Sequence, residues 1–256
     1  MIYRLRIPLL AVLLLAAACN PTHPRMQGPR LVLFVGVDIS GSFTKTENFG
    51  DSLRFLSYYI YGHLKGIGGL DKPRELFVGS IGGDSPNEPK AFHPIQEFER
   101  KSPQEIEAKL VELFSVRGNY LTDFNAFFKR VSETVQKRGL AMAPLTIVIA
   151  SDGVPDIALD NGRKVVEGLY DKVDVGPLEF LARNVTIRIL YPNPTVAQKW
   201  ERSIPRQRVR IWPVEAVIMR GWREQMEKKP KLEDEKRFWQ WVQDIVDHRV
   251  RRQKIL

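Results

Sequence analysis

Cysteine is almost absent from this chain: Cys19 is the only one in 256 residues. A single cysteine excludes an internal disulfide and any metal site built from several thiolates. A fold without disulfides has to be stabilised by an ordinary hydrophobic core, even in an exported protein, where disulfides could form. The length beyond residue 19 is enough for one large α/β domain.

The common signatures of catalysis are missing as well. The sequence contains no Gly-x-Ser-x-Gly elbow, no phosphate-binding loop and no dinucleotide fingerprint. Its four histidines are scattered, and no pair has the His-x-x-x-His spacing of a metal site. Asp84 and Asp123 are acidic residues that fit turn and helix-cap roles better than the role of a general base. These absences favour a binding protein over an enzyme.

Long apolar runs are also scarce, and the one at residues 7–18 is too short to span a bilayer comfortably. Arg4 and Arg6 precede it, and small residues lead from it into Cys19, which is the layout of a secretory signal. The stretch Leu-Ala-Ala-Ala-Cys resembles a bacterial lipobox, which implies that Cys19 becomes the lipidated first residue. We therefore predict a lipoprotein signal peptide at 1–18 and a proline-rich tether at 19–29. An uncleaved anchor helix and an ordinary signal are the alternatives.

The positive charge is unevenly distributed. Residues 20–196 hold 21 basic and 21 acidic residues, whereas residues 197–256 hold 16 basic and 9 acidic ones, a net +7. Such a patch usually suggests nucleic acid. Export argues against that partner and favours an anionic lipid surface or an acidic protein at the C-terminal tail.

The remaining pattern alternates apolar strands with amphipathic helices. Near-continuous apolar runs are typical of strands buried on both faces of a parallel sheet. We predict parallel strands at 31–38, 75–81, 145–150, 185–191 and 209–214, an antiparallel strand at 91–98, and helices starting near 53, 102, 122 and 197, with residues 165–181 partly helical. This order predicts an α/β fold: a doubly wound, mostly parallel sheet with helices on both faces.

A C-terminal amphipathic helix is predicted over residues 232–250. Phe238, Trp241 and Val242 share its apolar side. Two interpretations are open: the helix docks its aromatic residues, with Trp222 and Trp239, on the core, or it lies at a membrane interface, helped by the basic residues from 249 onward.

Polar residues follow two of the predicted buried strands. Asp38, Ser40 and Ser42 form an Asp-x-Ser-x-Ser stretch after the first strand, and Asp152 follows the strand at 145–150. Thr122 begins a helix. Carboxyl ends of parallel strands meet at the edge where ligands bind, so these side chains are expected to converge. Hydroxyl and carboxylate oxygens are hard ligands suited to Mg²⁺ or Mn²⁺.

These pieces, in this order, resemble the von Willebrand factor A (vWA) domain family over residues 30–214. The resemblance implies a Rossmann-like fold and a metal-ion-dependent adhesion site. Direct oxygens would come from Ser40, Ser42 and Thr122, while Asp38 and Asp152 would act directly or through water. The segment from Val154 to Gly162 departs from the family, and either brings Asp156 or Asp160 near the ion or forms an exposed polar loop.

Together these features predict an exported, lipid-anchored protein of the bacterial cell envelope that is not an enzyme. It binds Mg²⁺ or Mn²⁺ and, through the ion, an Asp or Glu of a protein partner. Residues 215–256 form a basic helical extension outside the vWA-like segment. The alternatives are a metal-dependent hydrolase of envelope substrates and a structural envelope factor with a vestigial metal site. Asn20 after the cysteine favours the outer membrane by the lipoprotein sorting rule, and facing the periplasm or the cell surface are both open.

The N-terminal prediction is tested by mass spectrometry of the mature protein from fractionated cells. We expect the chain to begin at Cys19 with acyl chains attached and to be recovered with the outer membrane. A protein that begins at Met1, or an unacylated Cys19, would contradict the anchor.

Overall fold

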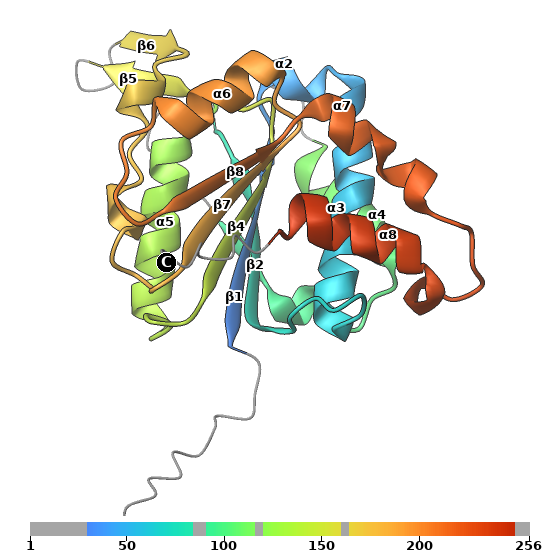
Figure 1. Ribbon diagram of the computed structural model, residues 1–256. Helices are drawn as coiled ribbons and strands as arrows, with labels where there is room; N and C mark the ends of the chain where they lie inside the picture. The colour runs from blue at the N-terminus through green and yellow to red at the C-terminus, as the bar shows by residue number, and fades with distance from the viewer. Residues whose placement is uncertain (1–29, 84–90, 116–119, 160–163, 249–256) are drawn as a thin grey trace, which may run out of the picture.

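A six-stranded sheet forms the centre of the computed structural model, which describes residues 30–83, 91–115, 120–159 and 164–248 (Figure 1). Its order is β3-β2-β1-β4-β7-β8, and every pairing is parallel except that of β3 with β2. Numbered along the chain, this is the 3-2-1-4-5-6 order of a doubly wound fold, which confirms the predicted class. The strands are β1 Leu31–Asp38, β2 Pro73–Ile81, β3 Phe92–Pro94, β4 Leu145–Ala150, β7 Val185–Leu190 and β8 Arg210–Val214.

β1 is buried along its whole length because both faces of the sheet are covered. Leu33 and Val35 point into one hydrophobic layer, whereas Val32 and Phe34 point into the other. This alternation follows from the two-residue period of a strand. It explains why the sequence reads as an unbroken apolar run rather than as alternating apolar and polar residues.

Helices cover both faces of the sheet (Figure 1). On one side lie α3 Glu47–Lys65, α4 Pro103–Phe114, α7 Ala216–Met219 and α8 Lys236–Trp241, and on the other α5 Phe124–Lys137 and α6 Pro194–Arg202. The start of α4 is fixed by a capping box between Ser102 and Glu105. Asp123 caps α5 by accepting a hydrogen bond from the backbone N–H of Ala126 at 2.9 Å. Within the described ranges, no helix combines the length and the apolar character needed to cross a bilayer.

Two segments differ from the predictions. The strand expected over 91–98 is limited to β3, and a 3-10 helix at Ile95–Glu97 follows it. Residues 164–167 are not helical: β6 Lys164–Glu167 pairs antiparallel with β5 Asp156–Leu159. The β-branched pair Val165 and Val166 favours a strand. Of the predicted helix, only 3-10 turns at Tyr170–Lys172 and Gly176–Leu178 form.

The C-terminal segment is not one long helix. A 3-10 turn at Leu232–Asp234 precedes α8, and a π-helix at Val242–Val246 continues it. The break falls at Glu235, which is buried and whose carboxylate accepts the backbone N–H groups of Glu227 and Lys229. Residues 232–235, which were predicted to belong to the helix, therefore do not join α8, because Glu235 binds the backbone of the preceding segment.

The aromatic residues of this segment are docked on the core, as the first of the two interpretations predicts. Trp222, Phe238 and Trp239 are all buried and share a hydrophobic layer with β1 and α3. Trp239 lies against Gly68, whose φ of +61° suits glycine and where an added Cβ would overlap the indole. Residues 216–246 therefore pack on the same core as the sheet.

Replacing Phe238 with alanine tests this docking. Phe238 contacts the rings of Tyr58, Trp222 and Trp239 with no exposed surface, so the free energy of unfolding should fall by about 3–5 kcal/mol. Urea titration measures the loss. Phe180→Ala is the matched control, because Phe180 is 73% exposed and its loss should change stability by less than about 0.5 kcal/mol. Equal stabilities of the two variants would contradict the docked segment.

Candidate metal centre

The five residues predicted as metal ligands lie at the carboxyl edge of the sheet. Asp38 is the last residue of β1, and Asp152 follows β4 by two residues. Ser40 precedes the short helix α2 Gly41–Thr44, which contains Ser42, and Thr122 stands just before α5. Because β1 and β4 are neighbours from which the chain winds in opposite directions, this edge is the topological switch point of the sheet.

Hydrogen bonds bring four of these residues together. The Asp38 Oδ1 atom accepts the backbone N–H of Ser40 at 2.9 Å and lies 3.5 Å from the Thr122 hydroxyl, which donates to it. The hydroxyl oxygens of Ser40 and Ser42 are 3.1 Å apart. Three hydroxyl groups and one carboxylate from two separate segments therefore converge on one point.

Asp152 joins this group through its charge rather than by a direct hydrogen bond. Its carboxylate raises the pKa of Asp38, so the two acidic groups lie close enough to repel each other. Asp152 Oδ1 accepts the backbone N–H of Val154 at 3.1 Å, which fixes the side chain in a local turn. Gly153 next to it has a φ of +78° and packs under Trp200, whose indole N–H donates to the Gly153 carbonyl at 2.7 Å.

Two further residues belong to this site: Ser151, which was not singled out from the sequence, and Asp156, which was named from the sequence as a residue that could lie near the ion. The Ser151 hydroxyl donates to Asp38 Oδ2 at 2.5 Å and accepts the backbone N–H of Gly153 at 2.9 Å. Asp156, at the start of β5, accepts the backbone N–H of Thr122 through Oδ2 at 2.8 Å and donates its own N–H to the Thr122 carbonyl at 3.0 Å. Ser151 is a serine beside Asp152, and no spacing rule marks it.

Asp156 therefore holds Thr122 in place, so the segment after Asp152 does bring it beside the site, through the backbone of a predicted ligand. It is half-buried on a strand, so it does not belong to an exposed loop. Asp160, the other candidate in that segment, lies outside the described residues, as do Asp84, Cys19 and the basic residues from 249 onward.

Burial makes the Asp38 carboxylate electrostatically unusual. The side chain has no exposed surface, and its pKa is raised from 3.8 to about 7, mainly by burial and then by the charge of Asp152. Hydrogen bonds from Ser151 and Ser40 work in the opposite direction and only partly offset this. Within the described part of the chain, no lysine or arginine is among the main groups that shift this pKa. A cation placed here would supply the missing positive charge.

The donor set fits a hard divalent cation. All five predicted ligands offer oxygen, and Mg²⁺ and Mn²⁺ favour oxygen ligands. Within the described ranges no group of three or more His, Cys, Asp or Glu side chains could hold a metal ion, so a soft or carboxylate-rich site is not the alternative. Asp38, Ser40, Ser42, Thr122 and Asp152 are the residues that could hold the ion.

The described histidines have partners elsewhere. His63 Nδ1 lies 2.8 Å from the Asp71 carbonyl oxygen, and His93 Nδ1 lies 3.1 Å from Glu97. The His248 ring stacks on Trp212. These contacts agree with locally bonded histidines, although His63 is fully buried rather than on the surface.

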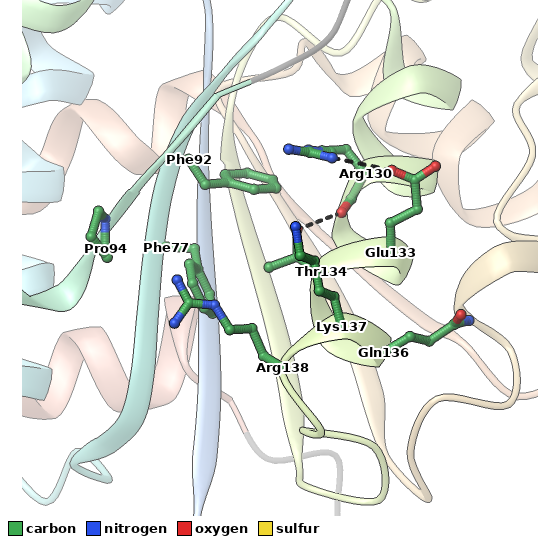
Figure 2. Close-up of a pocket in the computed structure, with 9 residues that line it drawn as sticks. All are labelled: Phe77, Phe92, Pro94, Arg130, Glu133, Thr134, Gln136, Lys137 and Arg138. Carbon is green, nitrogen blue, oxygen red and sulfur yellow. Dashed lines mark hydrogen bonds and ion pairs between the residues drawn. The ribbon is translucent and has the colours of Figure 1, made fainter.

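A separate groove lies between the edge of the sheet and α5, with a volume of about 620 Å³. Figure 2 shows Phe77 and Phe92 on its sheet side and Arg130, Glu133 and Arg138 on its helix side. Arg130 pairs with Glu133 at 3.3 Å across one turn of the helix. Its lining includes none of the predicted metal ligands.

Comparison with known proteins gives structural likeness only. No family model matches the chain, and no curated protein matches it by sequence. Proximal thread matrix protein 1 from the mussel byssus aligns with a TM-score of 0.46 and 9% identity over 75% of this chain and 46% of its own, so this chain spans less than half of that protein. Manganese-loaded TRAP protein of Plasmodium vivax gives 0.44 and 14% over 74% and 70%. The SpRpn10 VWA domain gives 0.38 and 12% over 82% and 93%. The fold class rests on the strand order, not on these scores.

Substituting Asp38 by asparagine should change how stability depends on pH. With a pKa near 7 in the folded chain and 3.8 in the unfolded one, metal-free protein holds a proton between these values that the unfolded chain has released. The free energy of unfolding should therefore fall as pH rises through this window. Asp38→Asn should lack this component and be the more stable protein at about pH 8.

Thermal unfolding with a chelator at about pH 5 and about pH 8 measures the difference. Asp171→Asn, at an exposed carboxylate, is the control and should follow the unmodified chain. Parallel pH profiles for Asp38→Asn and the control would contradict a raised pKa of the Asp38 carboxyl in the folded chain.

Proposed function

We propose that this chain binds Mg²⁺ or Mn²⁺ through Asp38, Ser40, Ser42, Thr122 and Asp152 and, through the ion, captures an acidic side chain of a protein partner. The observation that carries the proposal is the cluster at the buried Asp38 carboxylate: it accepts the Thr122 hydroxyl and the Ser40 backbone N–H, and the Ser40 hydroxyl lies 3.1 Å from that of Ser42. Hydroxyl ligands are neutral, so two carboxylates only balance a divalent charge, and a bound ion retains affinity for a further anionic oxygen.

Exposure limits the side from which a partner can approach. Asp38, Ser40 and Thr122 are buried, whereas Ser42 is exposed and Asp152 is half-exposed. A ligand for the ion would therefore enter past Ser42 and Asp152. A short carboxylate side chain on a protruding segment of the partner suits such a shallow approach.

Two residues keep the metal-binding groups in place. Ser151 holds one oxygen of Asp38, and Asp156 holds the backbone of Thr122 from both sides. Their hydrogen bonds link β1, β4, β5 and the start of α5, so the geometry is preorganised by the sheet and the hairpin. Preorganised ligands lose less entropy when the ion binds.

A binding role is favoured over the rival hydrolase. Metal-dependent hydrolysis needs a general base close to the ion, and the described histidines are bonded at other places. A vestigial metal site in a structural factor is the other rival. The burial of Asp38 favours a working site, because a buried carboxylate without a counter-ion lowers the stability of the fold through its desolvation cost.

The cellular setting belongs to the same proposal. Acylated Cys19 would hold the chain in the bacterial cell envelope, with the outer membrane favoured. The basic residues of the C-terminal tail would add contact with anionic lipid or an acidic partner, and an exported chain does not meet nucleic acid.

Calorimetric titration with Mg²⁺ and Mn²⁺ tests the ion site directly. Asp38→Ala removes one of two carboxylates and should weaken ion binding by about 100-fold, and Ser42→Ala, which removes a neutral ligand, by about tenfold. Asp171→Ala is the control, because this exposed carboxylate lies outside the site. Absence of binding to the unmodified chain would favour the vestigial scaffold.

Partner capture from crosslinked cells, with and without chelator, tests the second half of the proposal. Capture should be lost in Asp38→Ala and in chelator and should change little with salt, because the contact is shielded. Capture that survives both but fails at high salt would move the interface to the basic tail. Turnover of phosphodiester, ester or peptidoglycan substrates by the purified protein would instead establish the hydrolase.

A further inference from the structure

The end of the sheet opposite the metal centre carries its own distinctive surface. It is formed by segments that enter the strands, and backbone hydrogen bonds join them: the Val32 N–H donates to the Pro144 carbonyl at 2.9 Å, and the Met142 N–H to the Leu181 carbonyl at 2.7 Å. We call the exposed surface of Arg30, residues 138–144, residues 180–184 and residues 205–208 the amino-end face. In Figure 1 the starts of β1 and β4 are at the lower side of the sheet.

Two large apolar side chains stand in solvent on this face. Phe180 is 73% exposed and Met142 is 60% exposed. Met142 has a φ of +71°, which is uncommon for a residue with a side chain and is maintained here by its hydrogen bond to Leu181. Phe180 and Met142 thus offer exposed apolar side chains to a partner at this face.

Exposed arginines lie on the same segments as these apolar residues. Arg138, Arg183 and Arg208 are exposed on the same three segments, and Arg30 is exposed where the chain enters β1. The nearest carboxylate in sequence, Glu179, is buried and accepts the backbone N–H groups of residues 207, 208 and 209. The Glu179 carboxylate is therefore engaged inside the protein, whereas the arginines are exposed on the face.

We propose that the amino-end face rests on an anionic phospholipid surface. Arginines around a protruding phenylalanine and methionine match the headgroups and the upper acyl region of such a bilayer. The position of the N-terminal segment selects lipid over an acidic protein. Arg30, the first described residue, is on this face, and residues 20–29 extend at most about 35 Å. This argument rests on the anchor at Cys19 in the proposed function.

The contact would orient the metal centre. β1 runs from Arg30 at this face to Asp38 at the opposite edge, and its eight residues span about 26 Å. With the amino-end face on the bilayer, the side of Ser42 and Asp152 points into the aqueous space. A membrane-bound protein could then offer its metal site to a partner that is soluble or anchored elsewhere.

Tryptophan placed at the two ends of the sheet tests the orientation. The full-length chain is held through its own N-terminal segment on vesicles of phosphatidylcholine with about 30% phosphatidylglycerol, in chelator, with bromine-labelled acyl chains as quencher. Compared with the unmodified chain, the Phe180→Trp variant should show an additional component of tryptophan fluorescence that the brominated lipid quenches strongly. Val217→Trp is the matched control: Val217 is 66% exposed on α7, after the carboxyl end of β8, and its tryptophan should gain none.

Charge variants in the Phe180→Trp background identify the cause of the contact. Removing one arginine that contacts an anionic surface weakens the contact by about fivefold. The double variant Arg138→Gln with Arg183→Gln should therefore lower by about 25-fold the ratio of chains whose amino-end face touches the bilayer to chains whose face does not. Lys228→Gln with Lys229→Gln removes the same charge from another exposed segment and should leave the quenching unchanged. Raised salt should weaken it.

Three results would overturn the proposal: equal quenching at positions 180 and 217, quenching unchanged by the arginine substitutions, or quenching lost only with the lysine pair. The test is separate from that of the metal centre. Asp38→Ala should keep the quenching at position 180 while losing ion binding. Loss of quenching in chains that still bind Mg²⁺ would therefore reject the membrane face alone.

Discussion

The carboxylate of Asp38 has no exposed surface and lies at the end of a strand that is itself buried throughout. Its two oxygens accept hydrogen bonds from Ser40, Ser151 and Thr122, which come from segments that follow β1, follow β4 and precede α5. A buried negative charge is held only if the surrounding donors are fixed, because each lost donor adds to the cost of desolvation. The loops of this edge are therefore constrained by one side chain.

Other residues in turn fix the groups that surround Asp38. Thr122 can reach Asp38 because Asp156 binds its backbone, and Asp156 is fixed by the pairing of β5 with β6. Asp152 is fixed by a turn that depends on the positive φ of Gly153 and on the indole of Trp200. The hairpin and α6, which look peripheral to the sheet, thus determine the position of the acidic and hydroxyl groups.

The sequence predicted β1 and β4 to their observed ends because a strand buried on both faces leaves an unbroken apolar run. It failed where several patterns compete. Residues 165–167 were assigned to a partly helical segment although Asn161-Gly162, a strong hairpin signal, stands between two β-prone stretches. The helix over 232–250 was too long, since nothing in the sequence shows that Glu235 is buried and accepts two backbone N–H groups. Ser151 was missed, and the bond of Asp156 to Thr122 was not predicted, because both roles arise from contacts between segments and not from spacing.

A parallel sheet separates chemistry between its two edges. Chain leaving the strands places polar side chains at the carboxyl edge, where two carboxylates sit close together and raise the pKa of one of them. Chain entering the strands follows the ends of helices, where cations are favourable because the helix dipole is negative there. Arg138 is the residue after α5, and Arg202 ends α6. The acidic carboxyl edge and the basic amino-end face therefore both follow from the direction of the strands. In the proposed orientation, the face that binds anions is at the opposite end of the sheet from the cation site, which stays accessible to a partner.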